Sequence, residues 1–170
     1  MSDVLRDSTG QPIKKGYNYK IRIRHGLELC MYARDWNDNP GAHILAGGPA
    51  GCGSIFYIEQ DHWLSGTSMQ VKAKATTWNT FKTSDLYIVL DYFDSENVSV
   101  RLSPYGLQIQ DLWGIKGSGN NILLGVDPSH GMRLMPHGSP GAGFYQINID
   151  FAGAFLDVEF VKMPKVQLLS

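Results

Sequence analysis

Near the start of the chain lies the segment Leu5-Arg6-Asp7-Ser8-Thr9-Gly10-Gln11-Pro12-Ile13-Lys14-Lys15-Gly16-Tyr17-Asn18-Tyr19-Lys20-Ile21. The Asp7 side chain can accept hydrogen bonds from nearby backbone amides, and Gly10 can supply a positive φ, so residues 7–10 favour a turn. Pro12 fixes its own φ and stiffens the chain before the first strand. Tyr19 and Ile21 stand two residues apart, and we expect both to point inward from that strand.

Alternation with period two extends this pattern over residues 17–24, where Tyr17, Tyr19, Ile21 and Ile23 share one face. No stretch of the chain carries a convincing helical stripe, and clusters of Gly, Pro, Asn, Asp and Ser separate the apolar runs. The sequence predicts strands at residues 17–24, 27–34, 43–46, 54–60, 69–75, 86–93, 98–102, 107–113, 121–126, 132–135, 144–150 and 155–162.

This succession of short strands predicts an all-β protein. A β-trefoil, which has three units of four strands, is the favoured architecture, and a β-sandwich is the alternative. Tyrosine-containing segments at residues 19–23, 86–90 and 144–149 are roughly 60 residues apart and suggest a threefold repeat. No linker divides the chain, so residues 1–170 are predicted to form a single domain.

The opening segment resembles the start of plant Kunitz inhibitors of the soybean trypsin inhibitor type. In that family an Asp, a Gly, a Pro, a second Gly and a Tyr-x-Ile occur at the spacing of Asp7, Gly10, Pro12, Gly16 and residues 19–21. The resemblance covers residues 5–21 and implies a β-trefoil that inhibits proteases through a loop between its fourth and fifth strands.

Several positions depart from the family pattern. Lys15 stands where many inhibitors have an Asn that supports the reactive loop, and the two cysteines come too early for the usual two disulfides. The loop equivalent to the reactive loop is residues 60–68, which contain no Lys or Arg for the specificity pocket of trypsin. The resemblance therefore implies a protease-binding loop with Trp63 or Leu64 as an apolar anchor beside Ser65. Alternatively, Trp63 and Leu64 cap the end of the barrel.

The overall charge and composition exclude several classes of protein. The chain has 170 residues, a formal net charge of −1 and 18% charged residues, so no basic excess indicates a nucleic acid partner. Its polar first twenty residues are not a secretory signal, and no apolar run could span a membrane. We therefore expect a soluble protein without a signal peptide in this sequence; the compartment stays open, and secretion is possible.

The only two cysteines, Cys30 and Cys52, allow two interpretations. A disulfide between them would close a loop of about 22 residues and add about 3 kcal/mol of stability. Otherwise they are small buried apolar residues. Two cysteines and scattered histidines form no metal-ligand pattern, so no metal and no cofactor are predicted.

A second predicted binding site is a run of polar residues around a tryptophan, Asp35, Trp36, Asn37 and Asp38. Sugars stack on aromatic rings and share hydrogen bonds with Asp and Asn side chains, so this run could bind carbohydrate. This alternative is a lectin-like module of a defence or insecticidal toxin protein, with a cell-surface glycan or receptor as partner.

No catalytic constellation is recognisable, because the chain lacks a G-x-S-x-G elbow and a phosphate-binding P-loop. His130 and His137 each precede a glycine and are expected on solvated turns. The sequence therefore predicts a non-catalytic binding protein: a Kunitz-like protease inhibitor or a divergent relative without trypsin specificity.

Overall fold

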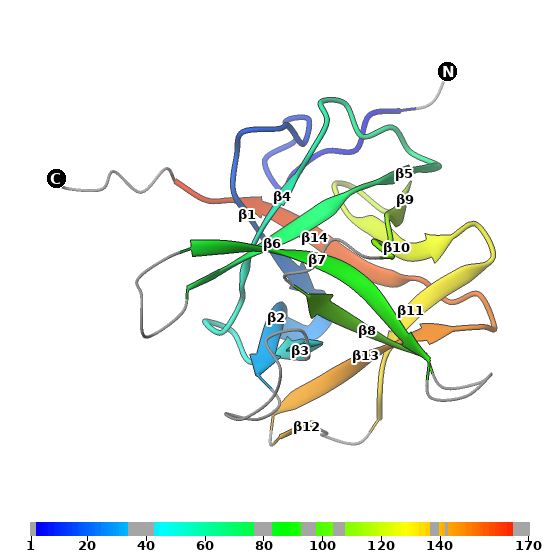
Figure 1. Cartoon of the computed structure of the whole chain (residues 1–170). Coiled ribbons are helices and arrows are strands. Elements are labelled where there is room, and N and C mark those ends of the chain that lie inside the picture. Colours follow the sequence, from blue (N-terminus) through cyan, green and yellow to red (C-terminus); the bar gives the residue numbers. More distant parts are fainter. Residues whose placement is uncertain are drawn as a thin grey trace, which may run out of the picture.

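The computed structural model is all-β, as the sequence predicts (Figure 1). Among the described residues the one helical segment is a short 3₁₀ turn, η1 (Arg24–Gly26), and no helix there is long and apolar enough to cross a membrane. The structure describes residues 3–33, 43–76, 83–92, 98–103, 108–136, 140–141 and 143–164.

Most strands lie where the sequence predicted them, with shifts of a few residues at their ends. The predicted fifth strand is divided in two by Gln70, and one two-residue strand is additional. The strands are β1 (Tyr19–Ile23), β2 (Leu27–Ala33), β3 (His43–Gly48), β4 (Ile55–Ile58), β5 (Thr67–Met69), β6 (Val71–Thr76), β7 (Thr83–Tyr92), β8 (Val98–Ser103), β9 (Leu112–Lys116), β10 (Ile122–Asp127), β11 (His130–Leu134), β12 (Pro140–Gly141), β13 (Phe144–Asp150) and β14 (Leu156–Lys162).

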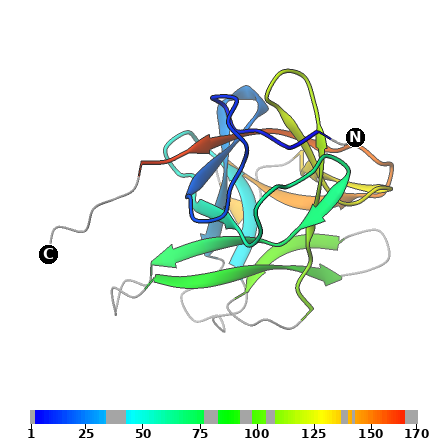
Figure 2. The same ribbon diagram turned by 90° about the horizontal axis from the view of Figure 1, so that it is seen from above.

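Half of the strands pair in a closed ring, which Figure 2 shows from above. In the described chain β1 pairs with β4, β4 with β6, β5 with β9, β9 with β10, β10 with β14, and β14 with β1 again. Since β5 and β6 are consecutive, they act as one bent strand and the ring is complete. A closed ladder leaves no exposed edge and differs from the two packed sheets of the alternative β-sandwich.

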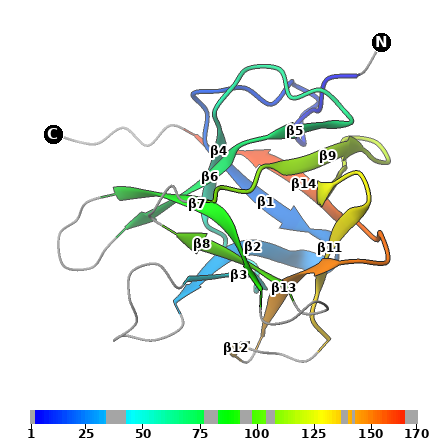
Figure 3. The same ribbon diagram turned by 45° about the vertical axis from the view of Figure 1, so that its right-hand side comes forward.

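The remaining long strands form three hairpins, β2–β3, β7–β8 and β11 with β13. These hairpins meet one another, because β3 pairs with β8 and β13 pairs with both (Figure 3). Each third of the chain therefore supplies two strands to the ring and one hairpin to this junction. The order ring strand, hairpin, ring strand repeats three times.

The three tyrosine-containing segments that suggested a repeat do not occupy equivalent places in these units. The segment at residues 19–23 is a ring strand, whereas β7 is the first strand of its hairpin and β13 is the second strand of another. A tyrosine in an alternating run is common in any half-buried strand, so it does not identify a position within a repeat. The threefold organisation is present, but the tyrosine-containing segments do not mark equivalent strands of its three units.

The opening segment forms the predicted turn and then enters the core. Asp7 is buried, and its Oδ1 accepts hydrogen bonds from the amides of Thr9 at 2.9 Å and Gln11 at 3.1 Å. Gly10 has a φ of 87°, which only glycine adopts readily. Tyr19 is buried in the core, and its hydroxyl accepts a hydrogen bond from the Lys14 amide at 2.9 Å.

The predicted strand at residues 107–113 is placed too early. β9 begins at Leu112, because Gln108 has a φ of 56° and breaks the extended backbone before that point. The amide of Gln110 instead donates a hydrogen bond to the Ile88 carbonyl at 2.8 Å. This connection is held by β7, a partner that no local sequence pattern reveals.

The turn between β1 and β2 contains a residue in a strained backbone conformation. His25 has a φ of 73°, and it is followed by Gly26 with a φ of 84°. Two successive residues with positive φ are the hairpin geometry that Asn-Gly prefers. We expect His25→Asn to raise the free energy of unfolding by about 0.5 kcal/mol, measured by urea denaturation. A loss of stability would contradict the left-handed conformation of His25.

Candidate functional site: the loop between β4 and β5

The loop between β4 and β5 is anchored by a tryptophan. Trp63 is fully buried, and its ring meets Phe160 of β14 edge to face with 5.8 Å between the ring centroids. Its indole Nε1 donates a hydrogen bond to the Thr67 carbonyl at 3.0 Å. The sequence left two roles open for Trp63, and in the structure its ring has no exposed surface with which to reach a partner.

The residues beside Trp63 pair with the N-terminal segment. The Leu5 amide donates to the Trp63 carbonyl, and the Ser65 amide donates to the Asp3 carbonyl, each at 2.7 Å. Val4 and Leu64 thus form an antiparallel bridge. The backbone on both sides of Leu64 is therefore fixed by hydrogen bonds to the N-terminal segment.

Leu64 points away from this anchor. Its side chain is 40% exposed, and among the described residues only Phe151 is another large apolar side chain with such exposure. Its carbonyl accepts a hydrogen bond from the Thr67 hydroxyl at 2.6 Å, which holds the turn after it. Leu64 is thus an exposed apolar side chain on a fixed backbone.

Ser65, the third predicted residue of the loop, faces β9. Its Oγ accepts a hydrogen bond from the Lys116 amide at 2.9 Å. This bond and the bond between the Gly66 amide and the Gly114 carbonyl attach the far side of the loop to the barrel. Ser65 therefore supports the loop.

The sequence did not reveal a further support at the near side of the loop. Asp61 accepts a hydrogen bond from the Lys15 amide through Oδ1 at 3.1 Å. Although Lys15 replaces the supporting Asn of many inhibitors, its backbone still contacts the loop. A carboxylate in an exposed loop gives no sequence signal for a partner 46 residues away, so only the structure identifies this contact.

The alternative site lies outside the described residues. Asp35, Trp36, Asn37 and Asp38 all fall there, so the structure neither assembles nor excludes a sugar site at that run.

The two cysteines are both described and both free. Cys30 is buried, and burial, together with the nearby Cys52 thiol and the Glu28 carboxylate, raises its pKa to about 12. The predicted alternative of a disulfide is therefore wrong for both residues. The alternative of two small buried apolar residues holds for Cys30 but not for Cys52, which is exposed.

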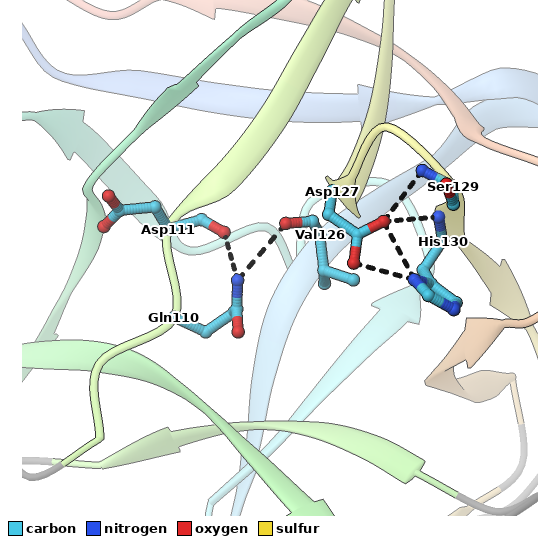
Figure 4. A network of polar contacts seen from close by, with 6 residues as sticks. All are labelled: Gln110, Asp111, Val126, Asp127, Ser129 and His130. Carbon is cyan, nitrogen blue, oxygen red and sulfur yellow. Dashed lines mark hydrogen bonds and ion pairs between the residues drawn. The ribbon is translucent and has the colours of Figure 1, made fainter.

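A polar network surrounds the turn between β10 and β11 (Figure 4). The His130 Nδ1 lies 2.7 Å from Asp127 Oδ2, while Asp127 Oδ1 accepts hydrogen bonds from the amides of Ser129 and His130 at 2.8 Å. Burial raises the pKa of Asp127, but these hydrogen bonds outweigh it and hold the pKa below its ordinary value. The two amide bonds identify the carboxylate as the cap of the turn at residues 128–129; His130 was predicted on the turn but is the first residue of β11, just after it.

Comparison of the sequence with protein-family models and with curated proteins finds no match. Solved structures do match the fold. The water-soluble chlorophyll protein from Brassica oleracea var. Botrytis, solved with chlorophyll b, has a TM-score of 0.70 at 16% identity, covering 95% of this chain and 99% of that one. The Kunitz-type cysteine protease inhibitor from potato has a TM-score of 0.69 at 12% identity, covering 98% of this chain and 100% of the inhibitor.

Soybean trypsin inhibitor, in its complex with porcine pancreatic trypsin, has a TM-score of 0.67 at 17% identity, covering 95% of this chain and 100% of the inhibitor. These matches extend over nearly the whole chain, far beyond the opening segment that suggested them. The expectation drawn from residues 5–21 is confirmed for the architecture: the chain has the fold of the Kunitz inhibitors of the soybean type.

Proposed function

We propose that this chain is a non-catalytic β-trefoil protein that inhibits a protease through the loop between β4 and β5, with Leu64 as the anchor side chain. The trefoil assignment is supported by the closed ring and the three joined hairpins. The one observation that carries the function is the 40% exposure of Leu64 on a backbone hydrogen-bonded on both sides.

A fixed loop favours inhibition because little conformational entropy is lost when the protease binds. The loop is held by Trp63 from within, by residues 3–5 along one edge, and by Lys15 and Lys116 at its two ends. An apolar anchor that fills a pocket on the partner is typical of binding hot spots. Leucine suits an apolar specificity pocket, such as those of chymotrypsin and subtilisin.

The names of similar structures support an inhibitor and also show that this fold serves other roles. The potato and soybean proteins are inhibitors by their descriptions, whereas the Brassica protein binds chlorophyll. Fold alone therefore does not choose between these roles, and the fixed loop with its exposed leucine supports inhibition. The lectin-like alternative receives no support from these relatives.

The test is an inhibition titration against chymotrypsin, subtilisin, trypsin and papain. We expect stoichiometric inhibition of chymotrypsin or subtilisin, and no inhibition of trypsin. Leu64→Ala should weaken inhibition by about 30-fold, the effect of losing a hot-spot side chain. Leu64→Arg should transfer inhibition toward trypsin, because the new side chain fits a pocket that contains a carboxylate.

The matched control is Phe151→Ala, which removes the other exposed large apolar side chain among the described residues. This variant should inhibit as strongly as the unmodified protein, because Phe151 lies on a different turn, after β13. If none of the four proteases is inhibited, the proposed function is wrong. If papain is inhibited and Leu64→Ala changes nothing, the protein is an inhibitor but its site is elsewhere.

A further inference from the structure

A polar cavity of about 250 Å³ lies on the outside of the barrel beside the turn between β1 and β2. It is formed where β1, β14 and the start of β10 run side by side, with Ile23 opposite Val158 and Val158 opposite Ile122. Because side chains alternate along a strand, the residues flanking these buried positions face outward. The charged and polar side chains that line it are Arg22, Arg24, His25, Asn121, Asp157 and Glu159.

Among the charged side chains of this cavity, Arg22 and Glu159 pair with each other, whereas Arg24 and Asp157 have no such partner within the part of the chain that the structure describes. Arg22 and Glu159 form an ion pair with 3.1 Å between Nη2 and Oε1. In the described part of the chain, the Arg24 guanidinium makes no hydrogen bond and no ion pair. The Oδ1 of Asp157 is buried and also lacks a hydrogen-bond partner. The cavity thus has an exposed guanidinium on one side and a carboxylate with a buried, unpartnered oxygen on the other, and neither has a protein partner among the described residues.

An uncompensated buried carboxylate oxygen is costly, so its position requires an explanation. The negative charge of a carboxylate is shared by both oxygens. A cation that enters the cavity and reaches Asp157 therefore compensates the buried oxygen as well. Arg24 offers the complementary group, a guanidinium whose fork matches a carboxylate.

A second cavity, of about 340 Å³, adjoins the first. The two cavities share Arg22 and Gly26 as lining residues. Ala50 and Val161 line the second cavity, together with Lys20 and Glu28, whose charged groups lie 4.0 Å apart. The long stems of Lys20 and Arg22 add apolar surface. A polar cavity with one charge of each sign thus continues into one with apolar walls.

We propose that these adjoining cavities bind a small zwitterion with an apolar side chain, of the class of a free α-amino acid. Its carboxylate is bound by Arg24 and its ammonium group by Asp157, and its side chain extends past Arg22 toward the second cavity. The second cavity, at about 340 Å³, is near the lower end of the roughly 300–1,000 Å³ typical of ligand sites, and the first, at about 250 Å³, is slightly smaller, which suits a small ligand.

The experiment is a titration of the isotope-labelled protein with L-leucine, followed by NMR at the backbone amides. We expect shifts at residues 24–26 and 157–159. N-acetyl-L-leucine lacks the ammonium group and L-leucinamide lacks the carboxylate, so each should bind at least about tenfold more weakly. L-alanine, which lacks the apolar body, should also bind more weakly.

The variants assign each charge to its partner on the ligand. Asp157→Asn should weaken the binding of leucine at least tenfold but leave N-acetyl-leucine unaffected, since that ligand has no ammonium group. Arg24→Gln should weaken the binding of leucine and leave the binding of leucinamide unchanged, since leucinamide has no carboxylate. Asp111→Asn, which changes an exposed carboxylate before β9, is the control and should bind leucine normally. Thermal melting shows whether each variant is folded before it is titrated.

Two results would overturn the proposal. The first is the absence of any shift at these amides with leucine at millimolar concentration, as expected if Arg24 and Asp157 simply pair with each other in solution. The second is N-acetyl-leucine binding as tightly as leucine, which would identify an anion site without a role for Asp157.

Discussion

Replacing Trp63 with alanine is expected to lower the free energy of unfolding by about 3–5 kcal/mol. The indole is fully buried and contacts Phe160, and the backbone of Gly114 lies so close that a Cβ there would be 2.7 Å from Trp63 Cζ2. Removal of the ring therefore leaves a cavity that its neighbours cannot fill. The measurement is urea denaturation at equilibrium, with a parallel thermal melt.

The control for this prediction is Trp63→Phe. Phenylalanine keeps an aromatic ring against Phe160 and loses the hydrogen bond from Nε1 to the Thr67 carbonyl. We expect it to cost about 1–2 kcal/mol. In Trp63→Ala the amide of Ser65 should also exchange its hydrogen faster, because the loop loses its anchor. A loss below about 1 kcal/mol in the alanine variant would contradict the buried position of Trp63.

The second large effect is expected for Gly131→Ala, a change of a single methyl group. Gly131 lies in β11, where a Cβ would be 1.5 Å from the carbonyl oxygen of Ala154. That oxygen belongs to the backbone of the turn before β14, so no side-chain rotation relieves the overlap. We expect a loss of at least about 3 kcal/mol, the upper end of overpacking effects, measured by urea denaturation.

Gly119→Ala distinguishes this overlap from the ordinary cost of replacing a glycine. Gly119 has a φ of 60°, and nothing lies within 4 Å of its Cβ position. Its substitution should cost only about 1 kcal/mol, through backbone strain. Equal losses for the two variants would mean that the turn before β14 does not approach Gly131 as closely as the structure shows.

The parts of this fold that could be predicted from sequence are those governed by local alternation. Tyr19, Ile21 and Ile23 were assigned to one inward face, and all three are buried. Tyr17, the fourth member of that face, is only half-buried because β1 begins after it. The turn at Asp7 was also predictable, since Asx turns depend on residues within a few positions of each other.

The parts that could not be predicted depend on contacts between distant segments. The backbone break at Gln108 and its replacement bond to Ile88 have no local signal, since a positive φ usually indicates glycine. The same is true of the candidate loop. Trp63 and Leu64 are neighbours of similar hydrophobicity, and only the contact with Phe160 and the bridge to Val4 show which of them is exposed.

The closure of the ring by its first and last strands bears on how the protein is made. Tyr19 of β1 pairs with Lys162 of β14, and the Met163 amide donates to the Asn18 carbonyl at 2.8 Å. A ribosome that adds ~5–20 residues per second needs roughly 7–30 s to translate the segment between these partners. During that interval one edge of β1 lacks its partner strand, so we expect the barrel to complete its folding only after β14 has emerged from the ribosome.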